Sequence, residues 1–199
     1  MSGAFGGLPT RSEPEGEVRG LGLVLPGRGY APAAPLLDFA SLALLQHGYA
    51  VEQVWWDSQE CPDDDPGGWV REQAAAASAA QPDVLPTTIV VGKSLGTRAA
   101  PWAAEQGYDA IWLTPLLFVD ELVAGIAAHP GRHLLVCGEA DEAWDAEVAA
   151  RLRRQGCDLM EIPDADHGLC VPGDVVRSAE IHVEVARRMA AFLAGPEPA

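Results

Sequence analysis

The sequence predicts an α/β domain in which a mostly parallel sheet of about six strands is covered by helices on both faces. Short apolar runs alternate with longer amphipathic or alanine-rich segments, which is the β-α repetition of a parallel sheet with right-handed crossovers. The apolar runs are nearly continuous rather than alternating, as expected for strands buried on both faces. The 199 residues suit a single domain whose core needs no disulfide bonds.

Six strands and six helices follow from these patterns. The strands are expected at 18–25, 49–56, 88–91, 110–113, 134–137 and 158–162. The helices are expected at 35–47, 69–80, 95–105, 120–128, 145–155 and 179–194. Residues 1–17 are rich in Gly, Pro, Ser and Glu without periodicity and are predicted to form a flexible leader. Residues 195–199 are predicted to form a flexible tail, which leaves 18–194 as the folded domain.

The charge of the chain restricts its partners. Twenty-nine acidic residues against thirteen basic ones give a formal net charge of −16, which disfavours binding to nucleic acid and to anionic membranes. No apolar run approaches the ~18 residues of a membrane span, and the first seven residues lack the features of a signal peptide. The four cysteines fit no C-x-x-C spacing, so reduced thiols are expected. These features predict a soluble, cytoplasmic protein, and they do not indicate its oligomeric state.

A G-x-S-x-G motif formed by Gly92, Ser94 and Gly96 lies between the apolar run at 88–91 and an alanine-rich helical pattern. A serine at such a strand-to-helix turn is held in a strained backbone conformation with its Oγ exposed. The two glycines allow the strand and the helix to pass closely, where larger side chains would collide. Lys93, at the variable position of the motif, is expected to reach solvent. The motif predicts that Ser94 is a nucleophile.

A serine hydroxyl needs a positioned imidazole to take its proton during attack on a carbonyl. Asp141 follows the strand expected at 134–137, and His167 follows the one at 158–162. Because the carboxyl ends of parallel strands meet at one edge of a sheet, Ser94, Asp141 and His167 are expected to lie together. Asp141 also has the position of a helix-capping carboxylate, so Glu139 and Asp120 remain alternative acids.

In these motifs the sequence resembles the α/β-hydrolase superfamily, in particular its small lid-less members near the dienelactone hydrolases, over about residues 18–194. The resemblance implies a single domain with Ser94 as nucleophile, Asp141 as orienting acid and His167 as general base. No cap domain is expected, because only residues 114–119 separate the strand at 110–113 from the next helix. Dienelactone hydrolases have cysteine where this chain has Ser94, so their particular substrate is not carried over.

The resemblance implies hydrolysis of a carboxylic ester or thioester of a small substrate through an acyl-enzyme. An acyltransferase and a catalytically silent binding protein on the same scaffold remain alternatives. The oxyanion of such a reaction needs two backbone N–H donors. By the family pattern Leu95 provides the first. The glycine-rich loop at 26–30 is expected to provide the second, from Arg28 or alternatively from Gly29 or Tyr30.

Two further segments bear on the site. Leu116, Leu117 and Phe118 are expected either to form the apolar wall of an open cleft or to pack in the core. The acidic stretch at 57–68 lacks the alternating spacing and the distal glutamate of an EF-hand loop, so it is expected to be a solvated loop. No cofactor and no metal is therefore predicted.

Overall fold

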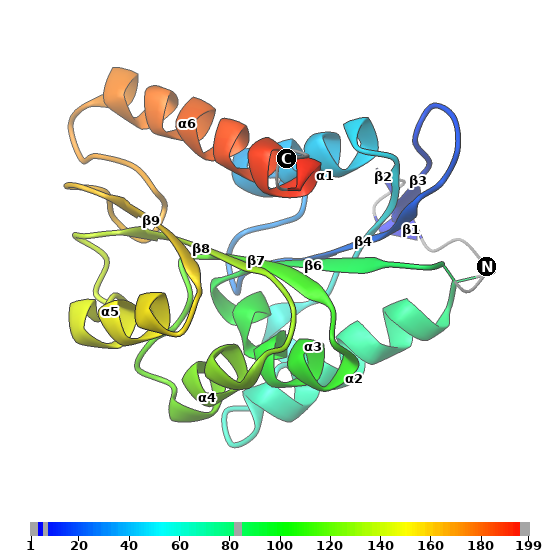
Figure 1. Cartoon of the computed structure of the whole chain (residues 1–199), viewed down its shortest axis with the longest axis horizontal. Helices are drawn as coiled ribbons and strands as arrows, with labels where there is room; N and C mark the ends of the chain where they lie inside the picture. The colour runs from blue at the N-terminus through cyan, green and yellow to red at the C-terminus, as the bar shows by residue number, and fades with distance from the viewer. Residues whose placement is uncertain (1–3, 6–7, 82–84, 196–199) are drawn as a thin grey trace.

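The computed structural model describes residues 4–5, 8–81 and 85–195, and a seven-stranded sheet forms its centre (Figure 1). The strand order is β3-β5-β4-β6-β7-β8-β9, and all neighbouring strands are parallel except β3 and β5. The strands are β3 (Arg11–Ser12), β4 (Gly20–Leu25), β5 (Tyr49–Gln53), β6 (Thr88–Lys93), β7 (Asp109–Leu113), β8 (His133–Gly138) and β9 (Asp158–Ile162). A separate two-stranded ribbon pairs β1 (Ala4–Phe5) with β2 (Leu8–Pro9).

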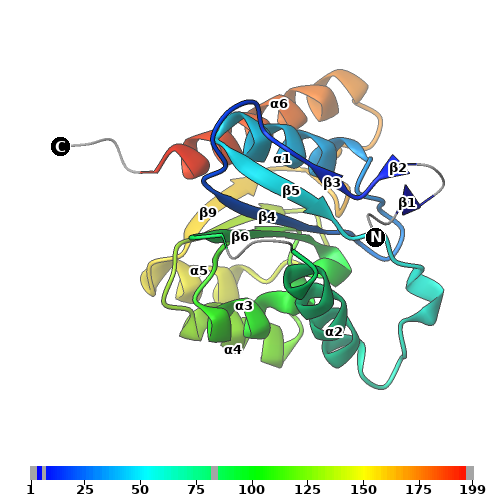
Figure 2. The ribbon, with the colours of Figure 1, turned by 90° about the vertical axis from the view of Figure 1, so that its right-hand side faces the viewer.

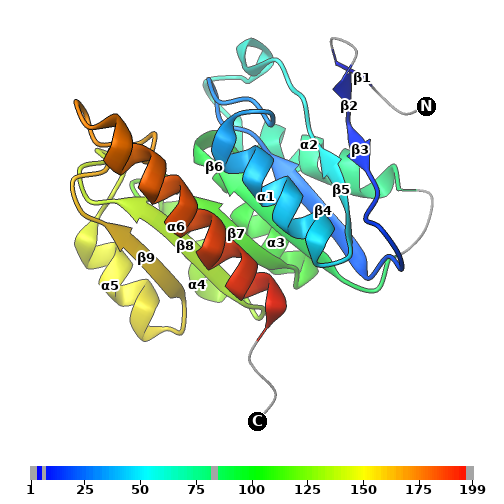
Figure 3. The ribbon, with the colours of Figure 1, turned by 90° about the horizontal axis from the view of Figure 1, so that it is seen from above.

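Helices cover both faces of this sheet, which confirms the predicted fold class. The helices are α1 (Pro35–Gln46), α2 (Pro66–Ala79), α3 (Ala100–Gln106), α4 (Asp120–Ala128), α5 (Ala146–Arg154) and α6 (Val175–Ala194), with 3₁₀ turns η1 (Ser58–Glu60) and η2 (Ser94–Ala99). Figure 2 shows α1 and α6 on one side of the sheet and α2, α3 and α4 on the other. Seen from above, α1 and α6 lie side by side over the sheet (Figure 3).

The sequence pattern predicts the six parallel strands but not β3. Arg11 and Ser12 pair antiparallel with Glu52 and Val51 at the edge of the sheet. Neither residue is fully buried, and the strand is defined by its backbone pairing with β5. A two-residue strand of this kind leaves no hydrophobic period to detect.

Two hydrophobic clusters, one on each face of the sheet, form the core. Leu23, Val90 and Trp112 of the central strands face the helices α2, α3, α4 and α5. Val24 and Val91, the next residues of β4 and β6, face α1 and α6. Alternate side chains of a strand point to opposite faces, so burial of both sets explains the continuous apolar runs.

Aspartates fix where three helices begin. The side chains of Asp65, Asp145 and Asp174 accept hydrogen bonds from backbone N–H groups in the first turns of α2, α5 and α6. Such caps satisfy donors that have no acceptor within the helix. As a result α2 and α6 begin at Pro66 and Val175, before the hydrophobic pattern becomes visible at 69 and 179.

Among the described residues, no helix has both the length and the apolar character that crossing a membrane requires. The cytoplasmic location stays a prediction.

Candidate active site

The turn after β6 has the strained geometry that the G-x-S-x-G motif predicts. Ser94 directly follows the strand and has a φ of +50°, in the left-handed region that non-glycine residues rarely occupy. A Cβ at Gly96 would lie 2.5 Å from the carbonyl oxygen of Leu25, and one at Gly92 would lie 2.7 Å from that of Gly96. Both glycines are therefore required by the close approach of backbone segments. The chain leaves Ser94 as the 3₁₀ turn η2 before α3, rather than as the single helix expected at 95–105.

His167 lies between Ser94 and Asp141 and contacts both. Its Nε2 is 2.8 Å from Ser94 Oγ, and its Nδ1 is 2.8 Å from Asp141 Oδ2. The three residues lie in the loops that follow β6, β8 and β9, so the carboxyl edge of the sheet brings them together. The imidazole is partly accessible, since 43% of its side chain is exposed, whereas the Asp141 side chain is 3% exposed.

The second carboxylate oxygen of Asp141 holds the local turn. Oδ1 accepts a hydrogen bond of 2.8 Å from the N–H of Ala143 while Oδ2 faces His167. Asp141 thus fills the capping position and the histidine-contacting position at once. The alternative acids Glu139 and Asp120 are exposed, and neither contacts His167 Nδ1, which Asp141 occupies.

The environment of Asp141 favours the carboxylate. Burial opposes ionisation, but the hydrogen bonds from His167 and from the Ala143 N–H, together with the positive charge of Lys93, outweigh it and lower the pKa of Asp141. An ionised carboxylate at Nδ1 holds the imidazole with that nitrogen protonated, which leaves Nε2 free to accept a proton from Ser94.

The expectation that Lys93 reaches solvent was wrong. Lys93 is 2% exposed. Its Nζ donates to Thr114 Oγ1 at 2.7 Å and to the carbonyl oxygen of His167 at 2.8 Å. Nζ also lies 5.0 Å from the centre of the Tyr30 ring. Burial lowers the pKa of Lys93 to about 8, although the nearby Asp141 carboxylate favours the charged form. The loop that carries His167 covers this end of β6, which a local motif does not reveal.

The loop at 26–30, which the sequence predicts to be an oxyanion loop, lies beside Ser94. A Cβ at Gly27 would be 3.5 Å from Ser94 Cβ. The Gly27 N–H already donates to the Tyr30 carbonyl at 3.0 Å, and Ser58 Oγ donates to the Arg28 carbonyl at 2.6 Å. The N–H of Leu95 lies in the first turn of η2, where helical N–H groups have no acceptor within the helix.

A surface hollow adjoins His167. Its lining comes from the loops after β7, β8 and β9, and consists of Leu116, Phe118, Ala140, Asp141, Glu142, Ala143, Asp166 and His167. The sequence left open whether residues 116–118 form a cleft wall or pack in the core. Leu117 is buried in the core, whereas Leu116 and Phe118 line the hollow. Phe118 is 67% exposed, so its ring offers apolar surface to this hollow.

No protein-family model matches the sequence, and no curated protein matches it significantly. Solved structures do match it. Est1E from Butyrivibrio proteoclasticus superposes with a TM-score of 0.67 at 15% identity, over 92% of this chain and 93% of that one. A dienelactone hydrolase from Anabaena variabilis gives a TM-score of 0.65 at 19% identity, over 92% of this chain and 89% of that one.

This chain has the α/β-hydrolase fold. A lid-less α/β serine hydrolase from Xanthomonas campestris also matches, with a TM-score of 0.56 at 18% identity over 94% of this chain and 89% of the other. This chain also lacks a lid, because residues 114–119 are the whole connection from β7 to α4 and leave no room for a cap. At these identities the likeness establishes the fold, and the activity has to be argued from the site.

Proposed function

We propose that this chain is a serine hydrolase that cleaves a carboxylic ester or thioester of a small substrate through an acyl-enzyme on Ser94. The observation that carries the proposal is the position of His167, whose two ring nitrogens lie 2.8 Å from Ser94 Oγ and 2.8 Å from Asp141 Oδ2. A hydroxyl, an imidazole and a buried carboxylate in this order are the groups that activate a serine for acyl transfer.

The mechanism follows from these contacts. Ser94 Oγ attacks the substrate carbonyl while its proton passes to His167 Nε2. Asp141 holds the ring orientation and stabilises the imidazolium, which then protonates the leaving alcohol or thiol. In the second half of the reaction His167 takes a proton from water as the water attacks the acyl-enzyme. The imidazolium then returns this proton to Ser94 Oγ as the carboxylic acid leaves.

The negative oxygen of each tetrahedral intermediate needs hydrogen-bond donors beside Ser94. We assign these roles to the backbone N–H groups of Leu95 and Arg28. The place of Leu95 in the first turn of η2 supports the first assignment. The N–H of Gly27 is already bonded to the Tyr30 carbonyl, so the second role is assigned to the next N–H along the loop, that of Arg28. Gly29 and Tyr30 remain the alternatives to Arg28.

The hollow beside His167 favours an uncharged, partly apolar substrate group. Leu116 and Phe118 offer apolar surface, whereas Glu142 and Asp166 place carboxyl groups along the lining. These carboxylates disfavour a substrate that carries its own negative charge near the ester. One solved structure of Est1E has ferulic acid bound, and the exposed ring of Phe118 would suit an aromatic group of that kind here.

The test combines labelling with turnover. The purified protein is treated with a fluorophosphonate probe, and hydrolysis of p-nitrophenyl acetate and butyrate is followed in parallel. We expect labelling and turnover that both disappear in Ser94→Ala, because the probe reacts only with an activated serine. p-Nitrophenyl hemisuccinate, which carries a carboxylate, should be hydrolysed more slowly than the butyrate ester.

Two other results would redirect the assignment. Absence of labelling in folded wild-type protein would contradict hydrolysis as proposed and leave a binding protein on this scaffold. Labelling with faster acyl transfer to an added alcohol or amine than to water would identify an acyltransferase.

A further inference from the structure

Lys93 is the only lysine in a chain that has twelve arginines. All twelve arginines lie within the described residues and none is buried, whereas Lys93 is 2% exposed. Burial of an ammonium is unfavourable unless its donors find partners. The one lysine therefore lies at the one buried cationic position, and its contacts indicate why.

Its ammonium group joins three loops at the carboxyl edge of the sheet. Lys93 ends β6, Thr114 directly follows β7, and His167 belongs to the loop after β9. The two hydrogen bonds, to Thr114 Oγ1 at 2.7 Å and to the His167 carbonyl at 2.8 Å, bridge segments that are far apart in sequence. The Tyr30 ring, 5.0 Å away, adds a cation–π contact from the oxyanion loop.

Two residues next to these hydrogen bonds have strained backbones, which points to a preorganised site. Thr114 has a φ of +46°, which is rare for a β-branched residue, and Ser94 has a φ of +50°. Such conformations persist where surrounding contacts fix them, and they cluster at functional sites. The Thr114 N–H donates to the Val136 carbonyl at 2.7 Å, while its side chain accepts from Lys93.

We propose that Lys93 is a positioning residue for the reaction, which holds the main chain of His167 so that the imidazole stays between Ser94 and Asp141. The expected effect on rate rests on the proposed hydrolase function, whereas the contact between Lys93 and the His167 carbonyl is independent of that function. Lys93 donates to the carbonyl group of His167, so its loss frees the backbone of the residue whose ring must bridge two partners 2.8 Å away on either side.

The chemistry of lysine suits this place better than that of arginine. An ammonium is a compact group whose three donors can point in separate directions, whereas a guanidinium is a planar fork. Here two donors reach Thr114 and the His167 carbonyl, and Asp141 and Asp166 supply negative charge nearby. Burial lowers the pKa of Lys93 to about 8, so the group is mostly charged at neutral pH.

The first experiment measures kcat and KM for p-nitrophenyl butyrate in Lys93→Met, which has a similar length and no donors. We expect kcat to fall at least tenfold with KM changed less than threefold, because an ill-placed imidazole slows proton transfer more than binding. Arg98→Met, which removes a positive charge from η2, is the control and should keep the wild-type kcat. Far-ultraviolet circular dichroism and thermal unfolding verify that each variant is folded.

A matched pair at Thr114 tests the acceptor separately. Thr114→Ser keeps the hydroxyl and should retain most of the activity, whereas Thr114→Val has nearly the same shape without the acceptor and should lose several-fold in kcat. Equal losses in the two variants would attribute the effect to packing and overturn the role of the hydrogen bond.

The second experiment does not depend on turnover. The proton on His167 Nδ1, in its hydrogen bond to Asp141, gives a low-field proton NMR resonance that His167→Ala assigns. We expect this resonance in the wild type and in Ser94→Ala, and its loss or broadening in Lys93→Met as the ring becomes mobile.

An unchanged resonance and a wild-type kcat in folded Lys93→Met would overturn the proposal. An unchanged resonance with a reduced kcat would overturn it too, since positioning would not be the cause. Loss of the resonance in Lys93→Met, with no turnover even in the wild type, would support positioning and reject only the hydrolase assignment.

Discussion

The two ends of strands β7 and β8 carry similar residues with different consequences. At the amino end, His133 begins β8, and Asp109 begins β7 and pairs with Arg132. At the carboxyl end, Asp141 follows β8 and contacts His167, and Thr114 follows β7 and accepts from Lys93. A histidine, a cation and an aspartate are present at both ends, and only their partners differ.

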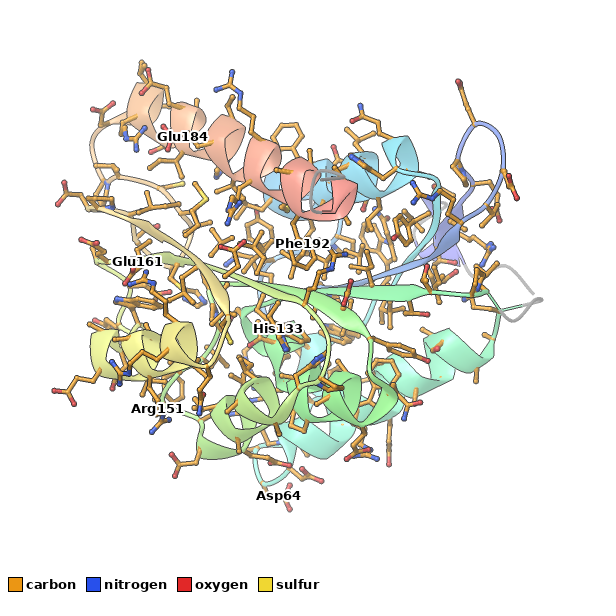
Figure 4. All side chains as sticks on the ribbon, in the orientation of Figure 1. Asp64, His133, Arg151, Glu161, Glu184 and Phe192 are labelled. Atoms are coloured by element: carbon orange, nitrogen blue, oxygen red, sulfur yellow. The ribbon has the colours of Figure 1, made fainter. Side chains whose placement is uncertain are left out.

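At the amino end the side chains contact one another. His133 is buried, accepts a hydrogen bond from the Trp112 indole at 3.3 Å, and packs edge to face on His129 with 3.8 Å between ring centres. Arg132 bonds both Asp109 and the Phe192 carbonyl, and lies over the Phe192 ring (Figure 4 labels His133 and Phe192). No hydroxyl or thiol nucleophile takes part in these contacts. Position at a strand end therefore does not distinguish the two histidines, and the difference is that a carboxylate and a hydroxyl face the ring of His167.

Replacement of the aspartate at each end should give the largest contrast. Asp141→Asn is expected to lower kcat by roughly 10³–10⁴-fold, because an amide no longer favours the productive tautomer of His167 or its charged form. Asp109→Asn should leave kcat unchanged and cost about 1 kcal/mol or less in unfolding free energy, since its pair with Arg132 is partly exposed. Ester turnover and urea unfolding measure the two effects. Equal kcat in the two variants would contradict the assignment of Asp141.

His133 should make the protein sensitive to acid. Burial, with a smaller effect from His129, lowers the pKa of His133 to about 4 from an ordinary value of 6.5. Between these values the unfolded chain binds a proton that the folded protein does not, so stability falls as the pH is lowered from about 6.5 to about 4. The loss amounts to roughly 3 kcal/mol. Urea unfolding of His133→Asn, which cannot titrate, should show a shallower decline over this range, while ester turnover at pH 7 stays near that of the wild type.

Lys93 should produce the corresponding effect at alkaline pH. Its pKa is lowered from 10.5 to about 8, so between these values the unfolded state binds the extra proton and stability rises with pH. The rise from this group is on the order of 3 kcal/mol. Burial raises the pKa of Tyr30, Cys137 and Cys157, and these groups oppose the rise. The difference in unfolding free energy between the wild type and Lys93→Met isolates Lys93, and it should increase with pH in favour of the wild type. A difference independent of pH would contradict the depressed pKa.

Phe118 should give the smallest effect, confined to binding. Phe118→Ala is expected to raise KM for an aromatic ester such as phenyl butyrate a few-fold, with stability nearly unchanged because the side chain is 67% exposed. Phe39 on α1, also partly exposed at 39%, lies on the other face of the sheet and serves as the control. Steady-state kinetics of both variants measure the difference. A similar change in KM for Phe39→Ala would show that the hollow at Phe118 does not bind the substrate.

Much of the candidate site could be predicted because its signals are local. Ser94 lies between two glycines at the end of an apolar run, and the backbone contacts of Gly92 and Gly96 require that pattern. Asp141 and His167 could be placed because parallel strands end at a common edge, so the order of strands along the chain already gives their neighbourhood. The choice of Asp141 over Glu139 was not decided by the sequence, since both carboxylates follow the same strand.

The sequence by itself determined the α/β alternation, the six parallel strands and the three strand ends that hold Ser94, Asp141 and His167. These features follow from hydrophobic periodicity and turn chemistry, which act over a few residues. Only the tertiary structure decided the pairing of β3 with β5, the burial of Leu117 beside the exposed Phe118, and the burial of Lys93 under the His167 loop. Each of these depends on segments distant in sequence, and a side chain's solvent exposure is fixed by what the rest of the chain places above it.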